Sequence, residues 1–202
     1  MDTTVLKGVP LFKDLDAEDL EGLGELMSET SLKRGDALFR EGDEGDRLYV
    51  LTEGKVKLSH SSDDGREYLI AVLGPGEIIG ELSLFDLGAR SSTVTAIAPT
   101  KLLSLSHKDM MVFLTAHPEL SQSMLRELAR RLRHTNEQMA DLVFSDVPGR
   151  VAKALLDLAN RFGERTPEGV YVPHDLTQEE LAHLVGASRE TVNKSLADFV
   201  SR

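Results

Sequence analysis

Residues 74–96 are rich in glycine and contain the residue types that bind a phosphorylated sugar. Glu81 follows Gly80 directly, and Arg90 and Ser91 begin nine residues after Glu81. Glycine lets a ligand approach the main chain, a carboxylate accepts from a sugar hydroxyl, and a guanidinium presents planar donors to a phosphate. The alternative is a structural ion pair between Arg90 and Glu81 in a turn. A P-loop is excluded because no Gly-Lys-Ser/Thr follows.

The C-terminal part has the pattern of two short helices joined by a tight turn. Thr177 with Glu180 three residues later predicts a capping box. Gly186 permits a tight turn and Ser188 is a good helix cap. In a helix-turn-helix, early side chains of the second helix meet base edges, where Arg reads guanine and Glu reads cytosine. The candidate DNA-binding residues are Ser188, Arg189, Glu190, Asn193 and Lys194. The alternative is a solvated helix hairpin.

Residues 121–144 contain no glycine or proline and predict a long helix. Their seam positions are spaced 3, 4, 3, 4, 3 along the chain: Leu125, Leu128, Leu132, Thr135, Met139 and Leu142. This heptad spacing predicts a dimer seam, and the alternative is an amphipathic helix lying on its own domain. The Thr135 hydroxyl needs a partner, either the main chain of its own helix or a ligand.

Composition excludes several classes of protein. The chain has 202 residues and no cysteine, which excludes disulfides, cysteine-ligated metal sites and a cysteine nucleophile. No apolar run is long enough for a membrane helix, and residues 1–16 do not resemble a secretory signal, so we expect a cytoplasmic protein. The net charge is −11; residues 1–117 carry −9 and residues 118–202 carry −2. A nucleic-acid site in the second part must therefore be local.

The remaining pattern predicts the elements that position these residues. A short helix is expected within 10–29, followed by short strands between glycine turns, including one turn at Asp64-Gly65. Such strands indicate a β-sandwich or barrel. The strands are expected at 48–51, 55–59, 67–73, 92–98 and 101–106. Asp146 and Pro148 predict the start of another helix, with a hinge at 146–150 and a loop or short hairpin at 163–175.

Three motifs in order resemble one family across essentially the whole chain. PGEIIGELSLFDLGARSSTVTA is similar to a cyclic-nucleotide phosphate-binding cassette, and it precedes the heptad helix and LVGASRETVNKSLADF. The chain thus resembles the cyclic AMP receptor protein/fumarate–nitrate regulator superfamily, closest to its actinobacterial-type members. The resemblance implies an α+β fold with a jelly-roll-like β-roll at 1–117, a dimerisation helix at 118–145 and a winged-type helix-turn-helix at 146–202. It also implies a wing that this chain, ending at Arg202, would lack.

The resemblance also implies roles for individual residues. Gly80 and Glu81 would contact the ribose, Arg90 and Ser91 would hold the cyclic phosphate, and Thr135 with Asn136 would reach the adenine together with the partner subunit. Arg189, Glu190 and Lys194 would read bases, although the family more often has Arg where Lys194 stands. The implied ligand is cyclic AMP. The implied partners are a second copy, double-stranded DNA with an inverted repeat, and RNA polymerase, with no membrane.

Alternatives remain at the level of function. One is a regulator of the same fold that senses another molecule or needs no cyclic AMP, and another is a cyclic-nucleotide sensor that never binds DNA. An enzyme is disfavoured because no base, nucleophile and orienting group come together in the pattern. No metal is expected. His60, His107, His117 and His134 could ligate haem, but their scattered positions favour surface or packing roles.

Overall fold

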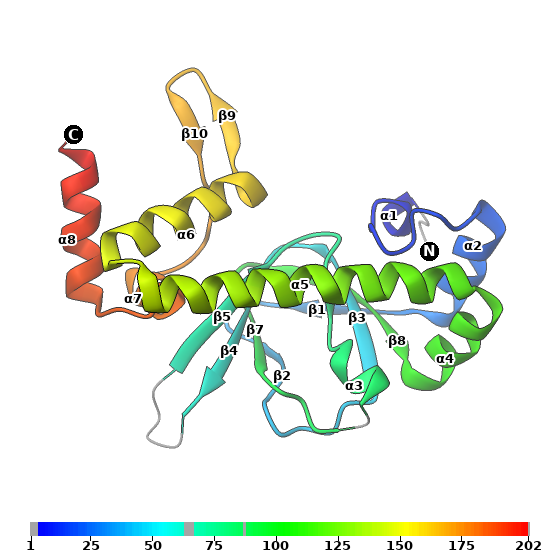
Figure 1. Ribbon diagram of the computed structural model, residues 1–202. Helices are drawn as coiled ribbons and strands as arrows, with labels where there is room; N and C mark the ends of the chain where they lie inside the picture. The colour runs from blue at the N-terminus through cyan, green and yellow to red at the C-terminus, as the bar shows by residue number, and fades with distance from the viewer. Residues whose placement is uncertain (1–3, 63–66, 87, 202) are drawn as a thin grey trace. The chain divides into compact units, whose positions relative to one another are not determined.

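The computed structural model describes residues 4–62, 67–86 and 88–201 (Figure 1). The turn predicted at Asp64-Gly65 lies outside these residues. The described residues group into two compact units. One comprises the chain up to Leu58 together with Val72–Leu132, and the other comprises Ser59–Ala71 together with the chain from Arg133 onward. The three functional segments expected from the sequence, at 1–117, 118–145 and 146–202, stay a prediction.

Two four-stranded sheets form the β-roll, which confirms the expected fold class. The first sheet has the order β1-β8-β3-β6, with antiparallel neighbours. Its strands are β1 (Ser28–Leu32), β8 (Thr100–Ser106), β3 (Arg47–Glu53) and β6 (Ile78–Ile79). The second sheet has the order β2-β7-β4-β5. Its strands are β2 (Ala37–Phe39), β7 (Thr93–Ala96), β4 (Val56–Ser61) and β5 (Glu67–Leu73).

All five predicted strands are present, whereas β1, β2 and β6 were not expected. The sequence of β1, SETSL, contains one large apolar residue and has no buried position. The other two strands contain only two or three residues. Such segments carry no alternation strong enough to be recognised in a sequence, because pairing with a neighbouring strand decides their conformation.

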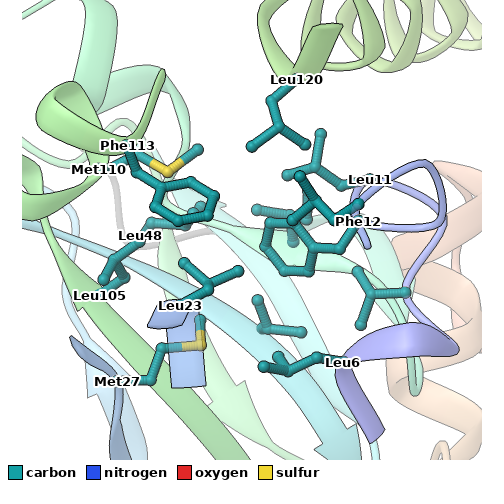
Figure 2. Packing of buried hydrophobic residues seen from close by; sticks show 14 of the residues in the cluster. Leu6, Leu11, Phe12, Leu23, Met27, Leu48, Leu105, Met110, Phe113 and Leu120 are labelled. Atoms are coloured by element: carbon teal, nitrogen blue, oxygen red, sulfur yellow. The ribbon is translucent and has the colours of Figure 1, made fainter. Parts of the chain in front are cut away.

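The core of the first unit lies between its first sheet and three short helices, α1 (Thr4–Lys7), α2 (Ala17–Leu26) and α4 (His107–Ala116). Figure 2 shows side chains from these helices meeting those of β3 and β8. The helix expected within 10–29 begins only at Ala17, because the Asp16 carboxylate caps α2 by accepting from the Asp19 amide at 2.9 Å. Turns occupy the residues before it, and they bury Phe12 completely.

The long helix α5 spans Pro118–Phe144, and its first part belongs to the first unit while the rest belongs to the second. Proline suits its first position because the amide at that position needs no partner inside the helix. The predicted helix at 121–144 is therefore confirmed and begins three residues earlier. Only Leu120 and Met124 are buried along its described length.

The second unit continues with α6 (Val147–Phe162), the hairpin β9 (Glu164–Thr166) and β10 (Gly169–Tyr171), α7 (Gln178–Val185) and α8 (Arg189–Val200). The predicted cap of α6 is confirmed, because the Asp146 carboxylate accepts from the Gly149 amide at 2.9 Å and Pro148 stands in the first turn. The helices enclose a small apolar core whose buried side chains are Val151, Leu158, Leu181, Ala182, Val185 and Val192.

Candidate functional site

The main chain fixes the position of Arg90 in the first unit. Its amide donates to the Asp43 carbonyl at 2.8 Å, and its carbonyl accepts from the Gly42 amide at 2.9 Å. These bonds tie the segment before β7 to the loop that follows β2. Arg90 as a whole is only 4% exposed, so its charged group lies inside the β-roll rather than in solvent.

The guanidinium of Arg90 is held by neutral groups. Nη2 donates to the Arg47 carbonyl at 2.8 Å, and Nη1 donates to the Gly80 carbonyl at 3.2 Å and to Ser83 Oγ at 3.5 Å. The ring of Phe39 lies 4.3 Å from the guanidinium carbon, a cation–π arrangement. In the described part of the chain no carboxylate forms an ion pair with this group. The positive charge is therefore oriented but not neutralised.

Two further properties show that the environment of Arg90 favours an anion beside it. Burial lowers the pKa of its guanidinium, and the fields of Tyr49, Asp46, Asp43 and Glu81 offset only part of this effect. Its Nε is buried and has no hydrogen-bond partner among the described residues. Because an arginine stays charged in a protein and a buried charge without a counterion is unfavourable, a bound anion would stabilise this site.

Gly80 is the residue that lets Arg90 lie where it does. Its φ angle is +80°, in the left-handed region that side chains disfavour. A Cβ atom at this position would overlap Nη1 of Arg90 and stand 3.1 Å from the Arg47 carbonyl oxygen. The group that lies close to Gly80 in the structure is the Arg90 guanidinium, and the expected close approach of a ligand stays a prediction.

Glu81 does not pair with Arg90, so the structural ion pair considered as the alternative is wrong. Its Oε1 instead accepts from Nη1 of Arg131 in α5 at 2.8 Å. Nη2 of the same arginine donates to the Ile78 carbonyl at 2.8 Å. Both side chains of this ion pair are largely shielded from solvent, with exposures of 12% and 26%. The pair ties the cassette to the long helix.

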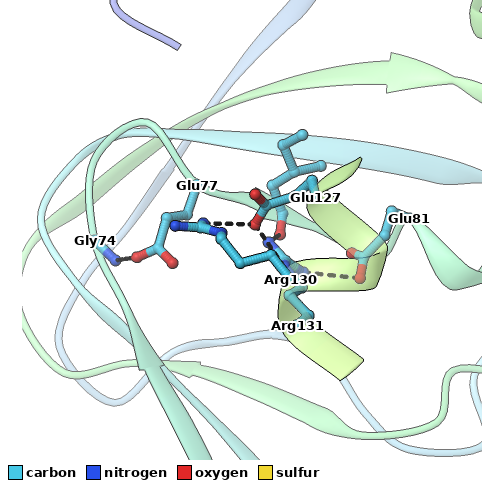
Figure 3. A network of polar contacts seen from close by, with 7 residues as sticks. Gly74, Glu77, Glu81, Glu127, Arg130 and Arg131 are labelled. Carbon is cyan, nitrogen blue, oxygen red and sulfur yellow. Dashed lines mark hydrogen bonds and ion pairs between the residues drawn. The ribbon is translucent and has the colours of Figure 1, made fainter. Parts of the chain in front are cut away.

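Glu127 holds Arg131 from within α5, as Figure 3 shows. Its Oε1 accepts from Arg131 Nε at 3.1 Å and from Arg130 Nη2 at 2.8 Å. Burial tends to raise the pKa of the Glu127 carboxyl, but the hydrogen bonds and charges of the two arginines outweigh burial and leave the pKa below its ordinary value. The guanidinium of Arg131 thus reaches Glu81 with each of its nitrogens engaged.

Arg131 is a residue of this site that was not among the candidates expected from the sequence. A signal was present in the spacing. Arg131 stands four residues before Thr135, and residues four apart lie on the same side of a helix. A cation on the side of α5 that was expected to face the ligand was therefore a further candidate for the site.

A hollow of about 560 Å³ adjoins this site within the first unit. It lies between α3 (Leu82–Phe85), the segment that follows α3, and the first turns of α5. Leu82 and Phe85 are half exposed there, at 53% and 52%. Ser91 lines the hollow, as does Ser83, which also contacts Arg90. Gly80, Glu81 and Arg90 do not line it, so of the four residues expected from this segment to contact the ligand only Ser91 faces the hollow.

The structure brings together three of the expected ligand residues, Gly80, Glu81 and Arg90, around β6 and α3, with Ser91 exposed beside them. Thr135 and Asn136 are exposed on the part of α5 that belongs to the second unit. Their contact with a ligand stays a prediction, as do the ligand contacts of the other four residues.

The predicted helix-turn-helix is present in the second unit. Thr177 and Glu180 form the capping box, with amide-to-oxygen distances of 2.8 and 3.1 Å. Gly186 adopts the left-handed conformation, with φ 64° and ψ 46°, and ends α7. Ser188 caps α8 by accepting from the Thr191 amide at 3.2 Å. Each local signal in the sequence is thus confirmed by the geometry it predicts.

The outer face of α8 carries most of the expected base-reading side chains. Arg189, Glu190 and Lys194 are exposed, whereas Val192 is completely buried. Asn193 differs from the expectation of an outward side chain, because its Oδ1 is buried and has no hydrogen-bond partner within the described chain. Asn193 is half-buried, so it is less accessible to DNA than the three exposed candidates on α8.

The seam of α5 is exposed in the single chain. Leu125, Leu132 and Met139 are 66%, 62% and 61% exposed, and Leu142 is 44% exposed. Large apolar side chains in a continuous row along a helix usually meet a partner surface. The exposure is what the heptad pattern predicts for a helix that pairs with a second copy.

The described residues contain no group of three or more His, Asp or Glu side chains placed to hold a metal ion. His117 stacks on Phe113, with 4.3 Å between ring centres, which is a packing role. Within the described ranges, no helix has the length and apolar character needed to cross a membrane.

Comparison with known proteins gives two matches to family models, in the expected order. Residues 29–117 match the cyclic nucleotide-binding domain, and residues 149–202 match the Crp-like helix-turn-helix domain. The first match contains the Gly80–Ser91 cassette, and the second contains α7 and α8. The cassette and the helix-turn-helix therefore fall inside the two matched domains, whereas the site residues contributed by α5 lie between the two matches.

Whole-chain relatives agree with these matches. A CRP-like cAMP-activated global transcriptional regulator of Mycobacterium tuberculosis is 47% identical over 198 residues, covering 98% of this chain and 88% of that protein. The solved catabolite activator protein of Thermus thermophilus is 33% identical, with a TM-score of 0.61 over 95% of this chain and 87% of that one.

A further solved structure is the c-di-GMP responsive global regulator CLP of Xanthomonas campestris. It is 26% identical, with a TM-score of 0.76 over 92% of both chains. The agreement in domains, order and length between these proteins and the present sequence leaves one assignment. The chain belongs to the family of CRP-like transcription regulators.

Proposed function

We propose that the chain is a homodimeric transcription regulator that binds cyclic AMP at the cassette and an inverted repeat of double-stranded DNA through α8. The observation that carries the proposal is Arg90, a buried guanidinium held by carbonyls and a ring, with one nitrogen unpaired and no carboxylate at contact distance among the described residues. A cyclic phosphate carries one negative charge, which matches this single cation.

The neighbouring residues suit the remainder of a nucleotide. Glu81 gives only Oε1 to Arg131, so its other oxygen is available to a ribose hydroxyl. Arg131 also neutralises Glu81, which would otherwise repel an anionic ligand. Ser91 adds a hydroxyl beside the phosphate position, and Thr135 with Asn136 would meet the adenine from the long helix.

Pairing of two chains through α5 accounts for its exposed seam. A two-fold dimer presents two copies of α8, so its target must contain two half-sites about one helical turn apart. In each half-site Arg189 and Lys194 would donate to guanines, and Glu190 would accept from a cytosine. The acidic β-rolls would oppose DNA binding, so affinity depends on this local basic face.

The ligand would act by shifting a population of conformations. A nucleotide that touches the cassette and α5 together favours the arrangement in which both are correctly placed. The Arg131–Glu81 ion pair already joins these elements. We further propose that the regulator works in the cytoplasm, meets RNA polymerase at its target sites and catalyses no reaction.

Calorimetry and DNA selection test this function together. Titration with cyclic AMP, cyclic GMP and c-di-GMP should show tightest binding for cyclic AMP. Selection from a randomised duplex pool should then recover an inverted repeat only when cyclic AMP is present. Recovery of the same repeat without ligand would favour a regulator that needs no nucleotide. The c-di-GMP arm is included because a structural relative responds to that molecule.

A further inference from the structure

Arg150, in the first turns of α6, connects the ends of two other helices. Its Nη1 donates to the Ser145 carbonyl at 2.8 Å, its Nε donates to the Val185 carbonyl at 2.9 Å, and its Nη2 donates to the Gly186 carbonyl at 3.3 Å. Ser145 follows the last residue of α5, and Val185 and Gly186 end α7. One side chain therefore contacts both helix ends.

The chemistry of these ends shows why arginine is suited to the position. The last carbonyls of a helix have no partner within the helix and carry the negative end of its dipole. A planar guanidinium can satisfy three carbonyls at once while placing one positive charge between two negative ends. A lysine could supply the charge but not the same three directions.

A second contact joins the same elements without polar groups. A Cβ atom added to Gly186 would stand 3.0 Å from Cδ2 of Leu142. The last apolar residue of the α5 seam therefore lies directly on the turn of the helix-turn-helix. Lys153 of α6 also forms an ion pair with Asp141 in the last turns of α5. The end of α5, the start of α6 and this turn are thus linked by three independent contacts.

The turn held by Arg150 leads directly into α8, which is called the reading helix below because its first residues are proposed to contact bases. Gly186 is followed two residues later by Ser188, which caps α8, and Arg189 is the first residue of α8. A change in the direction of the turn would therefore change where Arg189 and Glu190 point.

On the basis of the proposed function, we propose that Arg150 is a positioning residue that makes the end of α5 and the reading helix move as one body. The segment 146–150 was expected to act as a hinge. The Arg150 side chain reaches back across that segment to Ser145 and forward to the end of α7. A shift of the paired α5 helices would therefore move α8 with them rather than bend the chain at 146–150. Specific DNA recognition then depends on a residue that touches neither the nucleotide nor the DNA.

The test uses Arg150→Gln and Arg150→Lys in the full chain, with Arg161→Gln as the matched control. Arg161 lies on the same helix, and its ion pair with Asp157 stays within α6. Four quantities are measured: melting temperature, cyclic AMP affinity without DNA, and the affinities of the cyclic AMP-bound protein for the selected inverted repeat and for unrelated DNA.

We expect Arg150→Gln to reduce the ratio of specific to unrelated affinity by at least about tenfold, with cyclic AMP affinity changed less than about twofold. Arg150→Lys should recover melting temperature, because it restores the charge, but should not recover the ratio. A normal melting temperature with a reduced affinity ratio would separate a positioning role from a role in stability. The lysine variant also keeps the test valid if the glutamine variant does not fold.

Two results would overturn the inference. One is an unchanged affinity ratio in Arg150→Lys, and the other is an equal loss of that ratio in Arg161→Gln. Failure of the proposed function is seen separately in the wild-type protein, which would then select no inverted repeat and would remove the basis of this inference as well.

Discussion

The cassette and the reading helix both present an arginine, but in opposite settings. Arg90 is 4% exposed and is fixed by two carbonyls. Arg189 is exposed, and its Nη2 donates to Gln178 at the long distance of 3.4 Å. The first is oriented before any ligand arrives, whereas the second is free to adjust. A fixed, buried guanidinium suits a small anion such as a cyclic phosphate, whereas an exposed and adjustable guanidinium suits a long polyanion such as DNA.

The contrast has energetic consequences. A buried charge is poorly screened by salt, so it recognises one anion strongly and carries a desolvation cost while the site is empty. Exposed cations on a DNA-binding surface are screened, and their contribution falls as salt rises. Nucleotide binding should therefore depend weakly on ionic strength, while DNA binding should depend on it steeply.

The largest effect is expected from separating the two chains, because nucleotide binding at the cassette and DNA binding by α8 are both proposed to require the dimer. Leu128→Glu combined with Leu132→Glu places like charges across the seam, which should weaken dimerisation by about 3 kcal/mol or more. Sedimentation should then show monomers. Arg126→Glu with Arg133→Glu, on another face of the same helix, should leave the dimer intact. A persistent dimer in the seam variant would place the interface elsewhere.

Removing the buried cation tests the cassette side of the comparison. Arg90→Ala should weaken cyclic AMP binding by about 1.5–3 kcal/mol or more, because it removes a charge-assisted contact to the phosphate. Calorimetry measures the change, and Arg40→Gln, an exposed arginine of the same unit, serves as the control. Equal affinity in the Arg90 variant and wild type would show that Arg90 does not bind the phosphate.

The exposed face should behave differently. Glu190→Ala should relax preference at one symmetric base pair, at a cost of roughly 1–3 kcal/mol in discrimination, while binding to unrelated DNA stays intact. Selection from randomised duplexes gives the base profile. An unchanged profile would remove Glu190 from the set of base-reading residues.

Thr135 belongs to α5 and to neither arginine site, so it tests whether the long helix contributes to nucleotide binding. Thr135→Ala removes one hydroxyl and should weaken cyclic AMP by about 1 kcal/mol, with little change in melting temperature. The response of DNA binding to the nucleotide should become smaller. Unchanged affinity and response would leave the hydroxyl with a role inside its own helix.

The smallest effect concerns Glu127. The pKa of its carboxyl is lower in the folded chain than in the unfolded chain, so this group stabilises the fold above its unfolded pKa. That contribution is lost as pH falls through the folded pKa. Unfolding between pH 7 and pH 3 should therefore show a slightly steeper loss in wild type than in Glu127→Gln. Parallel curves would contradict the assigned shift.

The sequence predicted features that depend on a few neighbouring residues. The capping box at Thr177, the left-handed turn at Gly186 and the cap at Asp146 are local geometries in which one side chain satisfies a nearby amide or one glycine permits a tight turn. The long helix was equally accessible, because the 3,4 repeat that runs from Leu125 to Leu142 is typical of a long amphipathic helix. These signals recover the order of the elements and much of the reading helix.

Contacts between distant segments were not accessible in this way. Arg90 meets a carbonyl 43 positions away in Arg47, and Glu81 meets Arg131 at a separation of 50. Only the closure of the β-roll and its contact with α5 bring these groups together. The type of each residue suggested a phosphate site, but which carboxylate paired with which arginine required the folded chain.

Gly80 gives the regulator a single point at which sensing could be lost in evolution. Any other side chain there would meet the Arg90 guanidinium and the Arg47 carbonyl in a strained backbone conformation. One nucleotide change in the gene would thus displace the buried cation while leaving the helix seam and the reading face unaltered. A lineage could in this way keep the dimer and the DNA-binding helices but lose activation by the messenger, and a return to control would require glycine again.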